Sequence, residues 1–519
     1  MIFSSAIFIF FFAVVFFVQW YIIARLPGEN LRQRTLFLFL LFASYLFYMS
    51  WDWRFGLLIL FSTFVDYWAG IFISRRLEEG ESASEAGQDS QTNEADSLTT
   101  RARRKARMAL IISLIVNLGS LATFKYFHFF VDSFHNLMFA LDPSFGPPEE
   151  HQLLFRIILP VGISFFTFQS MSYTIDVYRK VIPVEKSFIK FALFVSFFPQ
   201  LVAGPIVTAR EFLPQLSRFP RIDSTDLREG CRIFLLGFIK KSVLADTVAP
   251  YADMVHADPL AFGFYAHWLA AIAFTMQLYL DFSGYSDMAI GSARLLGYQL
   301  PENFRMPYLS RSISEHWQRW HISLSRWFRD YLYIPLGGNR VGPVRHKLNL
   351  FAVMATSGLW HGAAWTYVVW GSIHGLAMVA EAVFKDGIAA ARDKFYRAGK
   401  WAERSWNALG WIYQIVFVTV CNTVFFRIQD ISYSWPVFKR LLALEGPTAM
   451  DIRPTHYRTV FLVLLVMIAG HILGRRFFSD HHLRSPLPRW AENLALPAVL
   501  VLLTQIAVLD QTTFIYFAF

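Results

Sequence analysis

A histidine in a tryptophan-rich apolar stretch is the first residue whose surroundings suggest chemistry. His361 lies in SGLWHGAAWTYVVWGSIHG, between Trp360 and Gly362, with almost no charge nearby. Ionisable residues inside a membrane are functional-site candidates by default because their burial is costly. Apolar surroundings favour the neutral imidazole, which is the form that a general base requires. We therefore predict that His361 is catalytic. A histidine in a membrane helix can also simply bond to a backbone carbonyl, and we keep that interpretation for His374.

A second candidate, His321, lies in RMPYLSRSISEHWQRWHISLSRWFRDYLYIPLGGNR. This stretch is dense in Trp, Tyr and Arg, which are stable at the level of lipid headgroups. If residues 314–331 form one helix, Trp317, His321 and Ser325 share a stripe and the helix lies in or near the interface. A purely anchoring role for this stretch stays open beside a functional one.

The charged residues of the same region have two interpretations. Arg319 and Arg326 could form a cytoplasmic mouth that attracts a phosphorylated or otherwise anionic donor. Asp281 and Asp287, in DFSGYSD, could act as general acid and base. Capping of a helix or pairing with a nearby arginine is the more common role for such carboxylates, and we expect it here.

The composition indicates whether these residues lie in water or in a membrane. Of the 519 residues, 55% are hydrophobic, 18% aromatic and only 17% charged, whereas soluble domains are nearer to a quarter charged. Apolar runs such as IFSSAIFIFFFAVVFFVQWYIIA approach the length of about 20 residues that a helix needs to cross hydrocarbon. This N-terminal run has no preceding basic residue and no cleavage pattern after it, so we expect a retained first span. The sequence predicts an all-α polytopic membrane protein.

The distribution of charge predicts a topology. Basic residues account for the net charge of +10 and cluster in alternate loops, which the positive-inside rule assigns to the cytoplasm. This places the N-terminus outside and gives about ten to twelve transmembrane or re-entrant helices. Residues 188–205 have basic loops on both sides and contain Pro199, Gly204 and Pro205, which predicts a broken helix. Residues 348–360 form another short segment that turns at His361. Irregular backbone at membrane depth survives where it lines a cavity, so both segments indicate an internal chamber.

One region lacks apolar character. Residues 77–100 are rich in Ser, Gln, Glu and Asp and are followed by RARRKAR, which predicts a disordered cytoplasmic loop ending in a basic membrane anchor rather than a nucleic-acid site. The predicted organisation is N-terminal transmembrane helices in 1–76, this loop in 77–107, a catalytic core in 108–428 with interfacial helices at 283–347, and C-terminal transmembrane helices in 429–519.

The sequence lacks the residue patterns that several other kinds of site require. Cys231 and Cys421 are isolated in apolar segments, which argues against a disulfide framework or a zinc site. His316 and His321 are about 140° apart on a helix and make a poor metal pair. The sequence contains no G-x-S-x-G elbow, P-loop or H-E-x-x-H motif.

Five motifs carry a family resemblance: PVGISFFTFQSMSYTIDVYR, FFPQLVAGPI, YLDFSGYSDMAIG, RWHISLSRWFRDYLYIPLGGNR and SGLWHGAAWTYVVWGSIHG. In order and spacing they resemble the membrane-bound O-acyltransferase family, most closely its bacterial branch that O-acetylates alginate or transfers D-alanine to teichoic acid. The resemblance runs from the first span to at least FFRIQD, and the acidic insertion at 77–100 has no place in it.

The resemblance implies helices around a central tunnel, with His361 as the catalytic residue and His321 as a second essential histidine. It also implies an acyl thioester donor such as acetyl-coenzyme A on the cytoplasmic side, no bound cofactor or metal, and a periplasmic SGNH-type acetyltransferase partner. The candidate substrate or tunnel residues are Trp360, Trp317, Ser325, Arg319, Arg326, Tyr285, Asp281 and Asp287.

The expected function is transfer of an acyl group, first of all acetyl, across the bacterial inner membrane for O-acetylation of an exported polysaccharide such as alginate. D-alanyl transfer to teichoic acid is an alternative within the family, and acetylation of peptidoglycan or cellulose is also open. A transporter or flippase of an acylated carrier is an alternative from another class, since broken helices and an intramembrane histidine suit it too. Covalent and direct acyl transfer both remain open.

Overall fold

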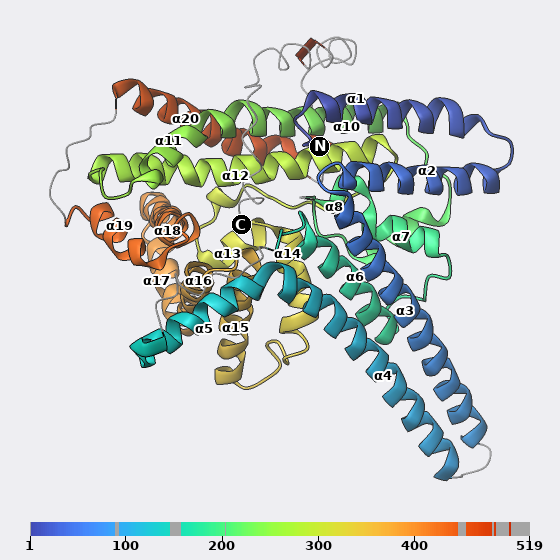
Figure 1. Ribbon diagram of the computed structural model, residues 1–519. Coiled ribbons are helices and arrows are strands. Elements are labelled where there is room, and N and C mark those ends of the chain that lie inside the picture. Colours follow the sequence, from blue (N-terminus) through green and yellow to red (C-terminus); the bar gives the residue numbers. More distant parts are fainter. Residues whose placement is uncertain are drawn as a thin grey trace. The chain divides into compact units, whose positions relative to one another are not determined.

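The computed structural model of the chain describes residues 2–88, 93–145, 157–202, 204–444, 453–479, 482–483 and 498–499. Nearly all of this is helical (Figure 1), and the strands of the described part are the two-residue antiparallel pair β1 (Phe478–Ser479) and β2 (His482–Leu483). The contacts divide the chain into two compact units, residues 1–223 with 293–300, and residues 224–292 with 301–519. The all-α prediction is confirmed.

Unit 1 contains the first helices of the chain, several of which continue into short π or 3₁₀ turns. Its α-helices are α1 (Ala6–Phe17), α2 (Glu29–Met49), α3 (Trp53–Gln88), α4 (Asn93–Leu121), α5 (Phe127–Leu141), α6 (Ile163–Tyr178), α7 (Phe188–Ser196), α8 (Phe198–Leu201) and α9 (Ala209–Phe212). The predicted break within 188–205 is confirmed. Phe197 separates α7 from α8 with ψ 110°, and Pro199 is the second residue of α8.

The prediction of a disordered loop at 77–107 is wrong for the described residues. Helix α3 continues through 77–88, and α4 already begins at residue 93, so the two helices run side by side as a hairpin (Figure 1). Thr99 Oγ1 donates to the carbonyl oxygen of Gly80 at 3.1 Å, and Ala102 packs beside the same glycine. Contacts between neighbouring helices stabilise a polar sequence whose own pattern does not predict a helix.

A buried carboxylate joins three helices of unit 1. Asp66 of α3 has no exposed surface. It accepts hydrogen bonds from Ser113 Oγ at 2.6 Å and Asn117 Nδ2 at 2.9 Å, both on α4, and from Ser170 Oγ on α6. Burial of a polar group is tolerated only where it is hydrogen-bonded, and the hydroxyl and amide donors of this cluster meet that condition.

Unit 2 holds the remaining helices. Its α-helices are α10 (Ser224–Phe238), α11 (Asp246–Ala257), α12 (Phe264–Leu295), α13 (Ile313–Arg319), α14 (Ile322–Phe328), α15 (Pro343–His361), α16 (Trp365–Val383), α17 (Lys385–Arg397), α18 (Lys400–Cys421), α19 (Ser434–Leu441) and α20 (Pro454–Phe477). The π turns η7 (Ile239–Ala245), η9 (Arg329–Tyr333) and η10 (Asn422–Phe426) extend three of them, and the 3₁₀ turn η8 (Pro307–Leu309) precedes α13. Helix α12 runs unbroken through DFSGYSD, so the predicted interfacial stretch does not begin there as a separate element.

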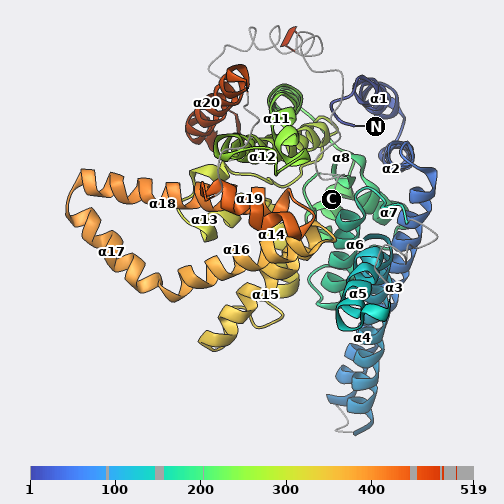
Figure 2. The same ribbon diagram turned by 60° about the vertical axis from the view of Figure 1, so that its left-hand side comes forward.

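Five helical stretches in the described residues are long and apolar enough to cross a membrane. These are Ala6–Arg25, Trp53–Glu85, Ser97–Leu141, Lys400–Phe426 and Pro454–Gly474. Helices α16 and α17 form a sixth candidate if they count as one span, with a 66° bend that is visible in Figure 2. This agrees with a protein that crosses the membrane several times. The larger count of ten to twelve, which includes re-entrant helices, stays a prediction, as does the predicted catalytic core at 108–428.

Candidate active site

The turn between α15 and α16 positions His361. Helix α15 ends at this residue, Gly362 is extended, and α16 begins at Trp365, as the sequence predicts. Two glycines let the helices approach closely. A Cβ on Gly358 would lie 2.2 Å from the carbonyl oxygen of Tyr367, and one on Gly371 would lie 2.4 Å from that of Met354. Small residues at such a crossing permit backbone-to-backbone packing, which fixes the position of the turn.

His321 lies at a break between two short helices, so the prediction of one helix over 314–331 is wrong. Helix α13 ends at Arg319, Trp320 is extended, and His321 adopts the left-handed conformation with φ 43° and ψ 54° before α14 begins. The expected stripe of Trp317, His321 and Ser325 therefore does not form. A left-handed histidine is uncommon, and such strain persists only where the surrounding structure imposes it.

Asn303 supplies the contacts that impose this break. Its carbonyl oxygen accepts from Ile322 N at 2.9 Å, and its Oδ1 accepts from Ser323 N at 3.3 Å and from Ser323 Oγ at 2.9 Å. Its Nδ2 donates to Ser286 Oγ of α12 at 3.0 Å. Asn303 thus pairs the free N–H groups at the start of α14 and ties His321 to α12. No pattern in the sequence singles out Asn303 as a site residue. The only local signal is that asparagine favours helix caps, and nothing in the sequence shows which helix it caps.

The two histidines meet in the interior of unit 2. The ring centroids of His321 and His361 are 6.3 Å apart, and the residues are 0% and 2% exposed. Trp360 contacts both rings, at 5.7 Å and 5.1 Å. Burial lowers the pKa of His321 to about 3, so its imidazole is neutral at neutral pH. It can donate or accept a hydrogen bond there but brings no positive charge.

A small cavity adjoins His361. It is lined by Leu278, His316, Trp317, Trp320, His361, Trp370, His374, Val418, Asn422 and Phe426. It has room for about one water molecule. Of the predicted site residues, His361 and Trp317 line this cavity, while His321 and Trp360 adjoin it through His361.

His316, a further histidine of this cavity, is held by the surrounding protein. Its Nδ1 accepts from Gln414 Nε2 of α18 at 3.0 Å, and the ring also hydrogen-bonds the backbone of Pro307. Burial lowers the pKa of His316 to about 4, against the effect of the Pro307 contact. Both hydrogen bonds hold the ring in place, so His316 is a structural part of the cavity wall.

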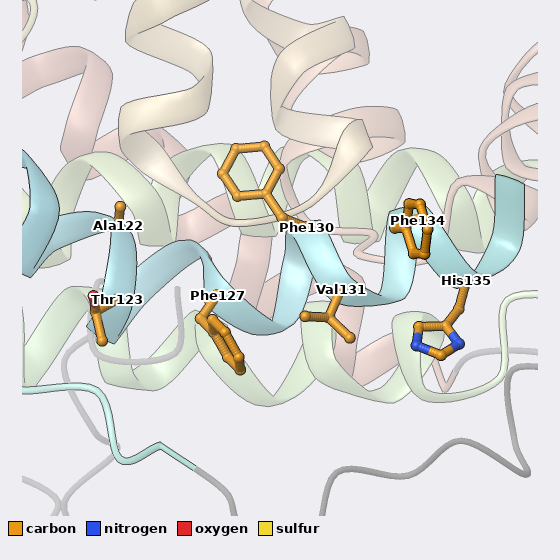
Figure 3. Close-up of a pocket in the computed structure, with 7 residues that line it drawn as sticks. All are labelled: Ala122, Thr123, Phe127, Phe130, Val131, Phe134 and His135. Carbon is orange, nitrogen blue, oxygen red and sulfur yellow. The ribbon is translucent and has the colours of Figure 1, made fainter. Parts of the chain in front are cut away.

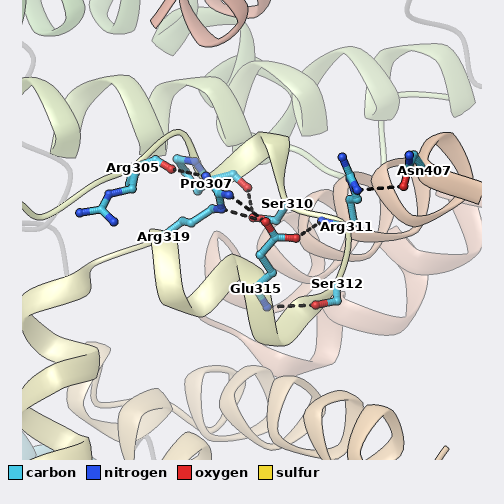
Figure 4. Close-up of polar contacts among 8 residues, drawn as sticks. All are labelled: Arg305, Pro307, Ser310, Arg311, Ser312, Glu315, Arg319 and Asn407. Carbon is cyan, nitrogen blue, oxygen red and sulfur yellow. Dashed lines mark hydrogen bonds and ion pairs between the residues drawn. The ribbon is translucent and has the colours of Figure 1, made fainter. Parts of the chain in front are cut away.

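Polar contacts fix helix α13, which carries His316 and Trp317 (Figure 4). Ser312 Oγ accepts from Glu315 N at 3.0 Å, and Arg311 donates to Asn407 Oδ1 of α18 at 2.8 Å. Arg319 forms a 2.9 Å ion pair with Glu315 and also donates to a backbone carbonyl. The charge of Arg319 is therefore balanced by Glu315, which weakens its expected attraction for an anionic donor.

The carboxylates of DFSGYSD pair with lysines, whereas capping of a helix or pairing with an arginine was expected. Asp281 lies 2.9 Å from Lys241 Nζ, which is also 2.6 Å from Asp246, and all three side chains are almost fully buried. Asp287 pairs with Lys240 at 2.6 Å. These pairs link η7 and α11 to α12. Neither carboxylate lines the cavity, and the same holds for the other candidate residues Tyr285, Ser325 and Arg326.

A wider hollow lies on unit 1, along η3 (Ala122–Tyr126) and α5 (Figure 3). It is lined by Ala122, Thr123, Phe127, Phe130, Val131, Phe134 and His135. Its walls come from one continuous helical run and contribute a single titratable residue, His135. Acid–base chemistry on an acyl group needs groups that converge from several elements, so the cavity at His361 is the better candidate.

The sequence and the site together define a family. The sequence model of the membrane-bound O-acyltransferase family matches residues 177–426, which include both histidines. The chain belongs to this family and is a multi-pass membrane O-acyltransferase.

Several curated relatives cover most of the chain. It is 38% identical to the probable alginate O-acetylase AlgI of Pseudomonas aeruginosa, over 95% of this chain and 85% of the relative. It is 32% identical to the peptidoglycan O-acetyltransferase of Helicobacter pylori, over 86% of this chain and 80% of the relative. The teichoic acid D-alanyltransferase of Bacillus subtilis is more distant, with 27% identity over 47% of this chain and 64% of the relative.

Proposed function

We propose that this O-acyltransferase passes an acetyl group from a cytoplasmic thioester, such as acetyl-coenzyme A, across the bacterial inner membrane for O-acetylation of an exported polysaccharide such as alginate. The observation that carries this proposal is the approach of His321 and His361 in the buried interior of unit 2. Acetyl transfer is favoured because the alginate and peptidoglycan acetylating relatives match most of the chain, whereas the D-alanyltransferase matches less than half.

The proposed step uses His361 as a general base. A hydroxyl of the acceptor attacks the carbonyl carbon of the thioester, and His361 takes the hydroxyl proton as the new C–O bond forms. The C–S bond then breaks, and the proton returns from His361 to the leaving thiolate. The products are an ester and a free thiol. Neutral His321 orients the thioester or donates a hydrogen bond to the oxygen on which charge develops.

A buried site suits this reaction. The rings of Trp360, Trp370 and Phe426 surround His361 at centroid distances of 5.1 to 5.4 Å. Exclusion of water limits hydrolysis of the thioester and strengthens hydrogen bonds to the reacting atoms. A periplasmic SGNH-type acetyltransferase is the partner that we propose for delivery to the polymer.

The test uses the purified protein in lipid vesicles with the proposed periplasmic partner. Acetyl-coenzyme A is the donor, and soluble alginate oligosaccharides are the acceptors. We expect ester-linked acetyl on the oligosaccharide. Parallel reactions with muropeptides, and with a D-alanyl thioester and a teichoic acid acceptor, separate the other acyl transfers. Movement of an acylated carrier across the vesicle membrane without any acyl transfer would instead support the transporter alternative.

A further inference from the structure

Three histidines of unit 2 hydrogen-bond the backbone one helical turn earlier. Nδ1 of His256, His267 and His471 lies 2.6, 3.0 and 2.9 Å from the carbonyl oxygen four residues earlier. A carbonyl oxygen can only accept, so in the neutral ring Nδ1 carries the hydrogen and Nε2 is an acceptor. This is the arrangement expected for a histidine that merely fits an apolar helix.

His374 has the opposite arrangement. Its Nδ1 accepts a hydrogen bond from Trp317 Nε1, which lies 3.3 Å away on helix α13. An indole N–H can only donate, so Nδ1 of His374 must be unprotonated. A neutral imidazole then carries its hydrogen on Nε2. Trp317 therefore fixes the tautomer in which Nε2 of His374 is a hydrogen-bond donor.

This donor is buried and unused. His374 is 1% exposed, and its Nε2 has no hydrogen-bond partner in the part of the chain that the structure describes. A buried donor without a partner costs about 1–3 kcal/mol, so such groups are rare and call for a reason. A ligand that supplies an acceptor is one such reason.

The position of His374 beside His361 indicates which ligand its Nε2–H group would bind. Its side chain lines the same small cavity as His361, and Trp370 contacts both imidazoles at centroid distances of 4.7 and 5.2 Å. His316 lines the cavity too, but Gln414 and Pro307 occupy its bonds. His471 also has an unpaired Nε2, yet it does not line the cavity. Among the histidines that the structure describes, His374 alone combines a fixed, unpaired donor with a position beside the proposed base.

We propose that the Nε2–H group of His374 binds the carbonyl oxygen of the acyl group during transfer, and that Trp317 is the positioning residue that holds the required tautomer. The proposal rests on the acyl transfer proposed above. A carbonyl oxygen accepts only, which matches a group that donates only. Negative charge grows on that oxygen as the hydroxyl attacks, so the hydrogen bond strengthens toward the transition state.

Kinetics of purified variants test this role. His374→Phe keeps a flat ring and removes the donor, and we expect kcat for acetyl transfer to fall by about 10²–10³-fold with little change in KM. His374→Gln restores an amide N–H and is expected to recover part of the loss. His471→Phe is the matched control and keeps the wild-type kcat. An unchanged kcat in His374→Phe overturns the proposal.

Infrared spectroscopy gives a readout that does not need turnover. The probe is acetyl-coenzyme A with a ¹³C carbonyl, bound to the full-length protein. We expect the carbonyl stretch at a lower frequency in the wild type than in His374→Phe, and at an intermediate frequency in Trp317→Phe, which leaves the tautomer free. Equal frequencies in the wild type and His374→Phe overturn the assignment. If the wild type acetylates no acceptor, the proposed function fails, whereas the carbonyl frequency still decides the role of His374.

Discussion

The ring centroids of His321 and His361 lie 6.3 Å apart, although His321 directly precedes a seven-residue helix and His361 ends a helix of 19 residues. Their closeness depends on two separate devices. The crossing of α15 and α16 at Gly358 and Gly371 sets His361, and the contacts of Asn303 set His321. Each device makes predictions that can be measured separately.

Replacement of His361 removes the proposed base. In His361→Ala we expect kcat for acetyl transfer to fall by about 10²–10⁴-fold, the usual contribution of general acid–base catalysis. The measurement is acetyl bound to exported polymer, at matched membrane levels of protein. His256→Ala, in which the lost ring hydrogen-bonds the Ala252 carbonyl oxygen of its own helix, serves as the control. Undiminished acetylation in His361→Ala is incompatible with the assignment, and loss in His321→Ala alone would exchange the two roles.

Loss of the Asn303 side chain should disturb His321 without touching the reacting atoms. Asn303→Ala leaves the N–H of Ser323 and the hydroxyl of Ser286 without their partner, at a cost of about 1–3 kcal/mol for each buried group. We expect slower transfer and a lower unfolding temperature. Asn407→Ala removes an exposed amide that bonds Arg311 and should change neither quantity. Equal behaviour of the two variants would mean that Asn303 does not position His321.

A side chain at the crossing of α15 and α16 should separate these helices. Gly371→Leu places Cβ 2.4 Å from the Met354 carbonyl oxygen and 2.8 Å from Gly358 Cα, and backbone cannot move aside cheaply. We expect loss of transfer and a lower unfolding temperature. Gly387→Ala in α17 meets nothing within 4 Å and should be neutral or slightly stabilising. Full activity in Gly371→Leu would show that the crossing does not set His361.

Asp66 should contribute to stability and not to chemistry. Asp66→Ala leaves Ser113, Asn117 and Ser170 without their common acceptor. Each buried donor that loses its acceptor lowers the stability by about 1–3 kcal/mol. Thermal unfolding in detergent measures the loss. Glu78→Ala, which removes an exposed carboxylate that accepts from Ser74 on the same helix, is the control. Equal unfolding temperatures for the two variants would contradict this role of Asp66.

The buried histidines predict a dependence of stability on pH. Burial lowers the pKa of His321 to about 3 and that of His316 to about 4, below the value of about 6.5 in the unfolded chain. Between these values the unfolded chain binds protons that the folded chain does not. The contribution to stability is therefore complete above pH 6.5 and is lost as the pH falls toward 3 to 4, by up to about 1.4 kcal/mol per pH unit for each histidine.

Unfolding temperatures between pH 7.5 and pH 5 measure this dependence. We expect the unfolding temperature to fall with pH, and to fall less steeply in His316→Gln, which lacks one of the two groups. Protonation of folded His321 should not limit transfer in this range. A slope that is the same in the variant would show that His316 is not buried in its neutral form.

The local patterns of the sequence were sufficient for the class of protein and for one end of the site. Apolar runs of membrane length predicted the helices, and the Trp-His-Gly turn at His361 was correctly placed between two helices. Hydrophobicity and turn residues act over a few positions, so they can be read directly along the chain.

The same patterns failed where distant contacts override local preference. Residues 77–88 and 93–107 are helical because α3 and α4 pack together. Residues 314–331 do not form one helix, because Asn303 accepts hydrogen bonds from residues at the start of α14 and the chain breaks at His321. The lysine partners of Asp281 and Asp287 come from η7, which no spacing within DFSGYSD indicates.

The sequence by itself determined an all-helical membrane protein with a buried histidine at a helix end. Only the tertiary structure decided that His321 joins His361, that Asn303 holds it there, and that Trp317 fixes the tautomer of His374. The physical reason is that a hydrogen bond or a ring contact requires atoms within a few ångströms, and residues far apart in the chain reach such distances only through the packing of the helices that carry them.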